Sequence, residues 1–285
     1  MKEKITAIVT VYNRFEYVRN MIISLKKQTK QIDELILADD GSKEELFPVI
    51  EDLLTDCNFT IKHVIQEDLA FRLSRSRNNG VRVSSGDFLI FMDQDLIFPN
   101  DFIEKVYNAR QKNKMLISVA IYSSEDEKNK IEAKIENDSY ENIFKYISKD
   151  KIDKAEKKVR KHKLNNILYA LKLRTRGMKM KGYFFALYKE DFIKLNGFDE
   201  KYIGWGEEDD DFCNRFYKMG GTLKCIEPSN FLIHMYHYSA PSKKESPNID
   251  YYRLRKKEIS KKNYKSYYGY NNTLGDDKYI VKNIK

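Results

Sequence analysis

The chain has 285 residues, of which 41% are hydrophobic and 13% are aromatic, so it can bury the core of one large domain or two small ones. Charged residues make up 33% of the chain, and the absence of any apolar run near the ~20 residues needed to cross a bilayer excludes a membrane-spanning helix. The net charge of +9 leaves three classes of anionic partner open: nucleic acid, acidic lipid headgroups and anionic polymers.

The first 122 residues alternate predicted strands with predicted helices, separated by turn clusters such as DDGS. The run DFLIFMD is typical of a strand that is buried on both faces. This rhythm predicts an α/β fold with an open, mostly parallel central sheet flanked by helices. The predicted strands cover residues 5–11, 34–39, 59–65, 87–93 and 115–122. The predicted helices cover residues 18–25, 44–54 (with Pro48 in the first turn or at a kink), 72–83 and 101–110.

Polar side chains stand at the ends of three of these strands. In open α/β sheets, ligands bind beyond the carboxyl ends of the strands, so we expect these side chains to meet in one crevice. Two acids separated by one residue can hold a divalent ion together with phosphates and a sugar, because Mg²⁺ and Mn²⁺ prefer hard oxygen ligands. A D-x-D pair also occurs in ordinary turns, but its position after an apolar strand favours a metal site. The side chains are Thr10, Asp39, Asp40, Asp93, Gln94 and Asp95.

Two further groups are candidates for the same crevice. His234 and His237 are two of the four histidines, and imidazole suits Mn²⁺ as a borderline ligand. The alternative is a pair of structural histidines, and His237 is the stronger metal candidate. Among the arginines of residues 72–77 we expect Arg77 to pair with a diphosphate, and the alternative is a solvated basic helix face.

Residues 124–180 interrupt the alternation with a charged, helix-forming insert. In its amphipathic part, Leu164, Ile167, Leu168 and Leu171 share one helix face. We expect this face to pack on the body of the protein. The alternative is a basic amphipathic segment that touches a membrane surface or a lipid-linked acceptor.

Positive charge is concentrated in two segments. Residues 151–181 carry a balance of +10 and residues 251–285 carry +7, which leaves −8 for the remainder of a chain whose net charge is +9. We therefore predict a domain over residues 1–240 and a basic, Tyr-rich extension over residues 241–285. No RNA-binding signature accompanies the basic segments, so we expect peripheral association with an anionic membrane and no nucleic acid.

The cysteines and the first residues bear on the compartment. The count of three cysteines is odd, and the spacings of Cys57, Cys213 and Cys225 match no zinc pattern, which indicates a reduced compartment. The run MKEKITAIVTVYNR predicts a strand and lacks the features of a signal peptide. We expect a cytoplasmic protein.

The run GWGEEDDDF at residues 204–212 places five consecutive acids behind a lone Trp205. Acids in the first turn of a helix are stabilised by about 0.3–1 kcal/mol each through the helix dipole, but five in a row point in different directions. We expect Asp210 or Asp211 to be structural and to pair with Arg215. Glu208 and Asp209 are expected to face the crevice.

Four blocks, IVTVYNR, LADDGS, RNNGV…GDFLIFMDQD and GFDEKYIGWGEEDDDFCNR, occur in an order that resembles family 2 glycosyltransferases of the GT-A fold. The last block resembles the C-terminal signature of β-1,4-galactosyltransferases and bacterial chondroitin-type polymerases. The resemblance covers residues 5 to about 240 apart from the insert.

The resemblance implies a role for each site residue. Asp209 would be the general base, and Trp205, Gly206 and Glu208 would bind the acceptor. Asp95 and His237 would hold the metal; His234 replaces a methionine of the galactosyltransferases and is a third metal candidate. The residues implied in nucleotide-sugar binding are Thr10, Tyr12, Arg14, Asp40, Arg77 and Asp93.

The implied activity is a metal-dependent inverting transfer, with Mn²⁺ or Mg²⁺, from a UDP-sugar to a hydroxyl of a glycan acceptor in bacterial surface polysaccharide biosynthesis. UDP-linked Gal, GalNAc and GlcNAc are the expected donors. The acceptor is expected to be a capsule, lipopolysaccharide or other glycan, free or lipid-linked, reached from the inner face of the membrane. The alternative is a nucleotide-sugar or nucleic-acid binding module without turnover.

Overall fold

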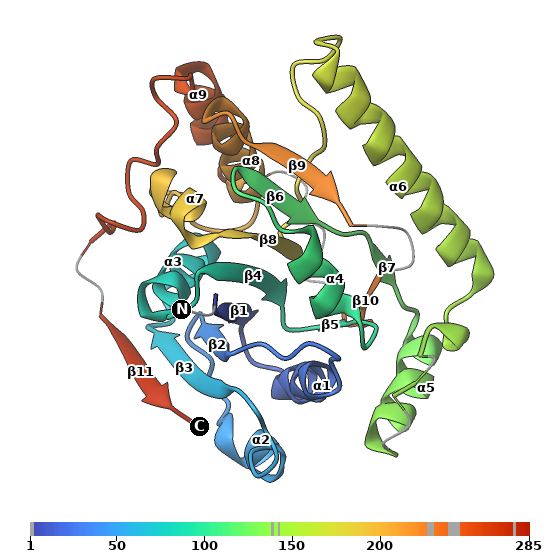
Figure 1. Cartoon of the computed structure of the whole chain (residues 1–285). Helices are drawn as coiled ribbons and strands as arrows, with labels where there is room; N and C mark the ends of the chain where they lie inside the picture. Colours follow the sequence, from blue (N-terminus) through green and yellow to red (C-terminus); the bar gives the residue numbers. More distant parts are fainter. Residues whose placement is uncertain (1–2, 138–139, 142, 227–230, 239–245, 276–277) are drawn as a thin grey trace.

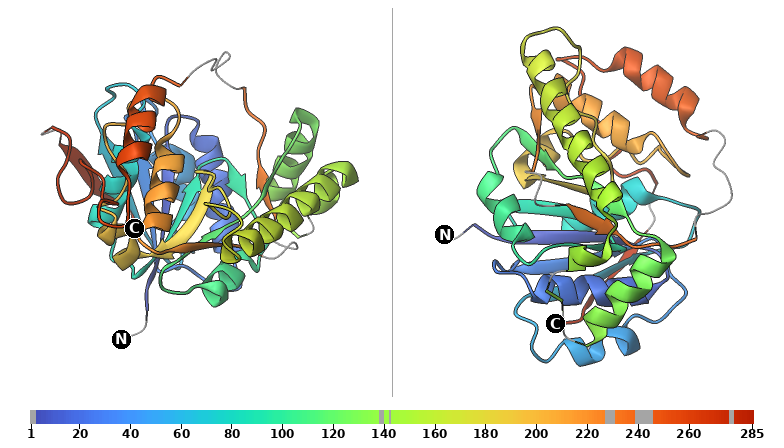
Figure 2. Two further views of the ribbon diagram at one scale, coloured as in Figure 1. Left: turned by 90° about the horizontal axis from the view of Figure 1, so that it is seen from above. Right: turned by 90° about the vertical axis from the view of Figure 1, so that its right-hand side faces the viewer.

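The structure, a computed structural model, describes residues 3–137, 140–141, 143–226, 231–238, 246–275 and 278–285. Its centre is an eight-stranded mixed sheet in the order β11-β3-β2-β1-β4-β8-β6-β9, with helices on both faces (Figures 1 and 2). The strands β1 to β4 pair in parallel, β8 runs antiparallel to β4 and β6, and β11 runs antiparallel to β3. The strands are β1 (Ile5–Val11), β2 (Glu34–Asp39), β3 (Thr60–Gln66), β4 (Phe88–Asp93), β6 (Lys114–Ile117), β8 (Phe184–Tyr188), β9 (Thr222–Cys225) and β11 (Tyr279–Asn283).

Helices cover both faces because side chains alternate along each strand. In β1, Ile8 belongs to one buried apolar cluster, and its neighbours Ala7 and Val9 belong to the other. The helices that pack against these clusters are α1 (Phe15–Lys26), α2 (Phe47–Ile50), α3 (Leu73–Val83), α4 (Phe102–Ala109), α7 (Lys189–Lys194) and α8 (Glu208–Lys218).

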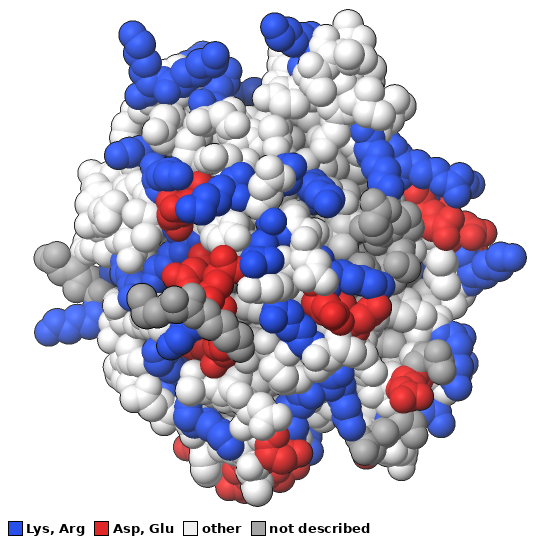
Figure 3. Space-filling model, in the orientation of Figure 1, with Lys and Arg blue, Asp and Glu red and all other residues white. Residues whose placement is uncertain are grey.

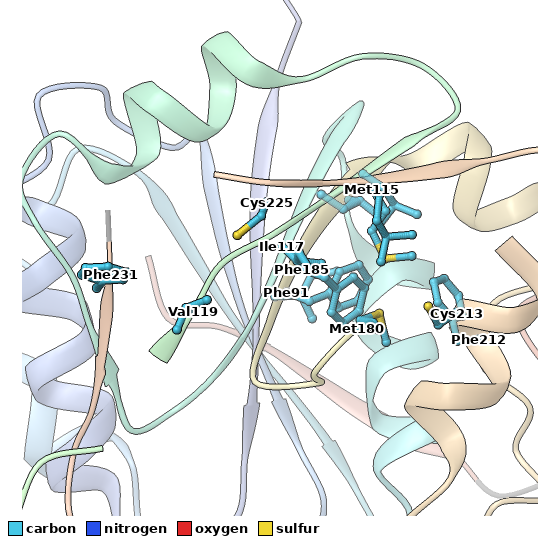
Figure 4. Packing of buried hydrophobic residues seen from close by; sticks show 14 of the residues in the cluster. Phe91, Met115, Ile117, Val119, Met180, Phe185, Phe212, Cys213, Cys225 and Phe231 are labelled. Carbon is cyan, nitrogen blue, oxygen red and sulfur yellow. The ribbon is translucent and has the colours of Figure 1, made fainter. Parts of the chain in front are cut away.

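Aromatic packing joins the sheet to α8. Phe91 of β4 stacks on Phe185 of β8, with ring centroids 4.4 Å apart, and Phe198 stacks on Phe212 of α8 at 4.3 Å. Figure 4 shows Phe91 and Phe185 beside each other, with Phe212 and Cys213 of α8 on the same side of the sheet. This packing holds α8 rigidly against the strand that carries the D-x-D acids.

A small second sheet, in the order β5-β10-β7, crosses the carboxyl end of β4. Its strands are β5 (Leu96–Ile97), β7 (Ala120–Tyr122) and β10 (Leu232–His234). The predicted strand over residues 115–122 is thus divided, because β6 stays in the large sheet and β7 joins the small one. In β10, His234 lies opposite Leu96, next in sequence to Asp95.

The insert forms α5 (Glu125–Glu136), a 3₁₀ turn (Ile143–Tyr146) and the long helix α6 (Lys149–Ala170). The expectation that the face of Leu164, Ile167, Leu168 and Leu171 packs on the body is wrong. Leu164, Ile167 and Leu171 are 54%, 57% and 63% exposed, and Leu168 is partly buried. The opposite face of α6 packs instead, through the buried Ala155 and Val159.

The C-terminal segment lies against the main body. Helix α9 (Ile249–Glu258) packs on α8, and β11 extends the main sheet at its β3 edge. The domain boundary after residue 240 remains a prediction, and residues 241–245 lie outside the described ranges. All three cysteines are buried and free of disulfides.

The predicted helix over residues 44–54 is only partly formed. Phe47–Ile50 is helical with Pro48 in the first turn, as expected, and Glu51–Leu53 continues as a 3₁₀ turn. Within the described parts of the chain, no helix combines the length and the apolar character that crossing a membrane requires.

Candidate functional site

A cavity of about 580 Å³ opens beyond the carboxyl ends of β1, β2 and β4. It lies between the strand ends, the N-terminal end of α8 and the short strand β10. Twelve of the thirteen predicted site residues line it: Thr10, Tyr12, Arg14, Asp40, Arg77, Asp93, Asp95, Trp205, Glu208, Asp209, His234 and His237.

The strand-end acids of the cavity are already hydrogen-bonded. Asp93 accepts a hydrogen bond from the Thr10 hydroxyl at 3.0 Å. Asp40 accepts one from Gln66 Nε2 at 2.5 Å and one from the backbone N–H of Arg72 at 2.7 Å. Burial raises the pKa of Asp40 to about 6, and burial also raises the pKa of Asp93. The hydrogen bonds from Thr10, Gln66 and Arg72 hold these two carboxylates in fixed directions.

Asp39 does not line the cavity, contrary to the expectation that all the strand-end acids meet there. Its Oδ1 accepts hydrogen bonds from Gly41 N–H and from the N–H and hydroxyl of Ser42. Its Oδ2 lies 2.7 Å from His63 Nε2. Asp39 thus shapes the turn that follows β2, because an acid that caps a tight turn cannot also face the cavity.

Gln94, between the two acids of the D-x-D pair, fixes the loop after β1. Its Oε1 accepts from Tyr12 N–H at 3.0 Å, and its Nε2 donates to the Asn13 carbonyl at 3.0 Å. Asn13 and Arg14 have left-handed backbone conformations, with φ of 50° and 56°. This arrangement directs Tyr12 and Arg14 toward the cavity.

Asp95, His234 and His237 form a three-residue cluster whose ligand atoms all lie within 4.8 Å of one another. His237 Nε2 is 3.0 Å from Asp95 Oδ2, and His234 Nε2 is 3.5 Å from Asp95 Oδ1. The hydrogen bond with Asp95 raises the pKa of His237. One carboxylate and two imidazoles are a donor set that suits Mn²⁺ and related ions.

The surroundings of this cluster fit a metal site. In each histidine, Nδ1 faces a backbone carbonyl, Met235 for His234 and Tyr238 for His237, so that Nε2 points to the centre. Buried Asp95 Oδ1 accepts no hydrogen bond from the described residues. A buried carboxylate oxygen without a donor is costly unless a cation binds it.

The four acids that begin α8, Glu208 to Asp211, divide into two pairs, as expected. Asp211 is fully buried and pairs with fully buried Arg215 at 2.6 Å. Asp210 pairs with Lys179 at 2.5 Å. Glu208 and Asp209 face the cavity. Because consecutive helix residues are about 100° apart, the four acids reach three different surroundings.

Asp209 lies beside a buried arginine and a glycine. Arg77 Nη1 donates to Asp209 Oδ1 at 2.9 Å, and Arg77 Nη2 donates to the Gly182 carbonyl at 2.9 Å and lies 3.8 Å from Asp93. A Cβ at residue 182 would lie 2.2 Å from Asp209 Oδ2, so only glycine leaves room for this carboxylate. Arg77 thus connects the D-x-D strand to α8.

Glu208 differs from its neighbours because it is buried and makes no direct ion pair with any residue that the structure describes. Its side chain is 7% exposed, and its Oε2 accepts no hydrogen bond from the described part of the chain. Burial first, and then the negative charge of Asp209, raise the pKa of Glu208 to about 8. At neutral pH Glu208 is therefore mostly protonated and can donate a hydrogen bond into the cavity.

Trp205 is 45% exposed at the edge of the cavity. Gly204 N–H donates to the Phe71 carbonyl at 2.7 Å, which ties this loop to the segment before α3. Gly206, predicted to bind the acceptor, does not line the cavity. It has a φ of 105°, and a Cβ there would lie 2.9 Å from Ser246 Oγ, so its glycine is required by the backbone turn and by this close approach.

Several lining residues escaped the sequence analysis. Tyr122 stacks on His234, with ring centroids 4.6 Å apart, and Gly182 sits against Asp209. Gln94 was expected at the crevice and does line it, but its hydrogen bonds to the loop after β1 were not predicted. The others missed are Val11, Phe71, Leu73, Ser76, Ser123, Tyr183, Met235 and Tyr236.

Comparisons with known families agree with this geometry. Residues 6–192 match the family described as Glycosyl transferase family 2, and residues 162–238 match the one described as the N-terminal domain of galactosyltransferase. The resemblance and the GT-A fold expected from the sequence are confirmed.

Among curated proteins, a validoxylamine A glucosyltransferase of Streptomyces hygroscopicus subsp. jinggangensis is 23% identical over 76% of this chain and 52% of that protein. Glycosyltransferase GlyG of Streptococcus pneumoniae serotype 4 is 27% identical over 45% of this chain and 42% of that protein. An uncharacterized glycosyltransferase of Rickettsia bellii is 30% identical over 50% of this chain and 20% of that protein. The matches therefore span about half or less of these relatives' length.

Among solved structures, GalNAc-T7 with UDP, GalNAc and Mn²⁺ superposes with a TM-score of 0.58 at 16% identity, over 87% of this chain and 45% of that chain. The mannosyltransferase PcManGT of Pyrobaculum calidifontis, with GDP-Man and Mn²⁺, gives 0.53 at 15% identity, over 91% of this chain and 62% of that chain. At such low identity these structures support the fold.

Proposed function

The chain belongs to glycosyl transferase family 2, and on that premise we propose that it transfers a sugar from a UDP-sugar to a glycan hydroxyl with inversion at the anomeric carbon. One observation carries this proposal. A candidate metal cluster (Asp95, His234 and His237) and a candidate base with an acid partner (Asp209 and Glu208) line one cavity.

The strand ends form the proposed donor side. Asp40, held by Gln66 and Arg72, is placed to contact the base of the nucleotide, and Asp93, held by Thr10, to contact the ribose. Tyr12 and Arg14 line the same side of the cavity. Arg77 carries a buried positive charge 3.8 Å from Asp93, and we assign it to the diphosphate as well as to Asp209.

Asp95, His234 and His237 would hold Mn²⁺ or Mg²⁺, which when bound would neutralise charge on the diphosphate leaving group. The two histidines favour Mn²⁺ over Mg²⁺, because Mg²⁺ prefers oxygen ligands.

Asp209 is proposed to take the proton of the acceptor hydroxyl as its oxygen bonds to the anomeric carbon and the bond to the diphosphate breaks. The Arg77 ion pair holds Oδ1, and Oδ2 lies over Gly182, where no side chain intervenes. Protonated Glu208 would donate a hydrogen bond to another acceptor oxygen. The face of Trp205 offers an apolar floor for a sugar ring.

UDP-linked Gal, GalNAc and GlcNAc are the proposed donors, supported by the match of residues 162–238 to a galactosyltransferase domain. A bacterial surface polysaccharide, such as capsule or lipopolysaccharide, is the proposed acceptor class. We place the reaction in the cytoplasm, with peripheral association at the inner face of the membrane. The uneven charge of the chain supports that association, because two basic segments carry +10 and +7.

The test is UDP release from a panel of UDP-sugars, with and without Mn²⁺ and with glycan acceptors. We expect Mn²⁺-dependent release with at least one donor, and loss of release in Asp209→Asn. A protein that binds UDP with Mn²⁺ but releases no UDP from any donor would be a binding module, and the proposal would be wrong.

A further inference from the structure

The second half of α6 exposes an apolar surface that no other described part of the chain covers. Leu164, Ile167 and Leu171 lie on one side of the helix, and Leu173, just beyond its end, is 69% exposed. At 100° per residue this side is opposite to Ala155 and Val159, which pack on the body. We call the side that carries these four residues the outer stripe.

Cations without acids surround the outer stripe. Residues 157–174 contain seven Lys and Arg and no Asp or Glu. Lys157 and Lys161 precede the stripe on the same side of α6, and Lys172 and Arg174 follow it; all four are exposed. An exposed apolar patch with cations at both ends is typical of helices that lie in the surface of an anionic bilayer.

A second basic element lies at the same end of the molecule. The views in Figures 1 and 2 agree that the C-terminal end of α6 and helix α9 both lie there. On α9, Leu254 is 52% exposed between the exposed Arg253 and Lys257. Figure 3 shows basic side chains gathered over α9 and beside the largely uncharged upper end of α6. Both basic segments of the sequence thus lie at this end of the molecule.

This surface is connected to the cavity by a short segment. Between Leu173 and cavity-lining Gly182, Lys179 pairs with Asp210 at 2.5 Å, and Arg176 lies 3.6 Å from the same carboxylate. Asp210 is next in sequence to Asp209, the proposed base. A surface that holds α6 against a bilayer would therefore also bring the cavity near it.

We propose that the outer stripe of α6, with its flanking cations and with α9 at the same end of the molecule, docks the protein on an anionic phospholipid bilayer. Leucine and isoleucine side chains would enter the boundary between headgroups and acyl chains, and lysines would contact lipid phosphates. The proposal deepens the peripheral association put forward above by naming the surface, and it rests on that part of the proposed function.

Two other occupants fit less well. A symmetric pair of chains would bring the four cations that flank the stripe close to their own copies, which repels. A nucleic acid would bind the cations but would leave the apolar side chains in water. A bilayer with acidic headgroups is the occupant that uses both the apolar and the basic parts.

The test is co-sedimentation of the full chain with vesicles of phosphatidylcholine alone and with vesicles that also contain phosphatidylglycerol. We expect binding to the second kind only, weakened by salt. The triple change Leu164→Ser, Ile167→Ser and Leu171→Ser should lower that binding at least tenfold. Phe47→Ser, a change at a 51% exposed residue on α2, is the matched control and should bind like the wild type.

A second variant tests the cations. Lys157→Gln, Lys161→Gln and Lys172→Gln together should weaken binding to the phosphatidylglycerol vesicles about fivefold per lysine. Lys43→Gln with Lys112→Gln, on exposed residues elsewhere, should have little effect. All variants change exposed side chains, and circular dichroism with thermal melting checks that each one folds.

Wild-type protein that sediments with neither vesicle, or variants that bind as the wild type does, would overturn the proposal. So would a wild-type dimer in sedimentation velocity that the serine variant abolishes, because the stripe would then bind a second copy. UDP release in solution, without vesicles, is measured on the same variants and should not change. Lost vesicle binding with intact UDP release thus separates this inference from the proposed transferase activity.

Discussion

The two sides of the cavity obtain their carboxylates in different ways. On the strand side, Asp40 and Asp93 come from separate strands, and hydrogen bonds from neighbouring residues hold each one. On the helix side, one turn of α8 supplies four consecutive acids, Glu208 to Asp211. Three of them pair with cations, whereas Glu208 Oε2 accepts no hydrogen bond from the described residues.

The difference shows how position alone can divide similar residues into different roles. A parallel sheet brings distant residues together and holds each in a similar environment. The first turn of a helix rotates its side chains, so neighbours in sequence meet the cavity, a surface lysine or the core. We therefore expect substitutions on α8 to have effects that differ sharply from one residue to the next.

The largest effect is expected for Asp209→Asn. An amide cannot accept the acceptor proton, so kcat should fall by about 10²–10⁴-fold while UDP binding with Mn²⁺ stays within a few-fold. Steady-state UDP release and isothermal titration with UDP measure the two quantities. The matched control is Asp210→Asn, which loses its ion pairs with the partly exposed Lys179 and Arg176 and should change kcat less than tenfold. Equal losses of kcat in the two variants would contradict the different roles assigned to Asp209 and Asp210.

Asp211→Asn should instead act on stability. It leaves Arg215, which is fully buried, with an unpaired charge, and removing one partner of a buried pair costs about 3–5 kcal/mol in the free energy of unfolding. Urea unfolding followed by circular dichroism measures this cost. A change below about 1 kcal/mol would mean that Arg215 is compensated by its bonds to the Leu195 and Gly197 carbonyls alone.

On the strand side, Asp95→Ala should weaken Mn²⁺ binding by on the order of 100-fold, because it removes the one carboxylate of the cluster. Titration of Mn²⁺ followed by electron paramagnetic resonance measures the affinity directly, without turnover. Asp39→Ala, at an acid that does not line the cavity, is the control and should leave Mn²⁺ affinity unchanged. Unchanged affinity in Asp95→Ala would move the metal site elsewhere.

Glu208→Gln should have the smallest effect at neutral pH and a clear pH dependence. The pKa of Glu208 is raised from 4.5 to about 8, so folding is penalised by its ionisation only as pH rises from about 4.5 through about 8. The variant, which cannot ionise, should therefore melt at about the wild-type temperature at pH 4.5 and several degrees higher at pH 8.5.

The same variant tests the proposed hydrogen bond to the acceptor. A glutamine N–H can replace the donor of protonated Glu208, so the acceptor KM should stay within about fivefold of wild type at pH 7. Above pH 8 the wild-type KM should rise, and the KM of the variant should not. Parallel pH profiles would show that Glu208 is not the titrating group.

The sequence was sufficient for β1 to β4 and for most of the cavity, since apolar runs followed by polar residues mark strand ends whatever the partner strand is. It could not place Asp39 outside the cavity. One of the residues that hold this carboxylate, His63, lies on β3 and becomes its neighbour only in the folded sheet. Tyr122 and Gly182 were missed for the same reason: their importance comes from His234 and Asp209, far away in sequence.

The outer stripe of α6 shows a different limit. An amphipathic pattern predicts a helix with an apolar side, but it does not say what covers that side. Here the packed side of α6 has specific partners on the body: Ala155 and Val159 are buried in the core, Tyr169 contacts Tyr217, and Asn166 Nδ2 donates to the Leu223 carbonyl. The side of α6 that packs is therefore the one that fits its neighbours, although the other side is more hydrophobic. The periodicity of the sequence does not reveal those neighbours.

The pairing of β11 with β3 has a consequence for biosynthesis. More than 200 residues separate Gln66 of β3 from Tyr279 of β11, its partner in the sheet. At about 5–20 residues per second, a ribosome needs roughly ten seconds or more to make that stretch. During this time the edge of β3 is open to pairing with another nascent chain. Gln66 also holds Asp40, so the nucleotide side of the cavity would reach its final rigidity only after β11 has been made.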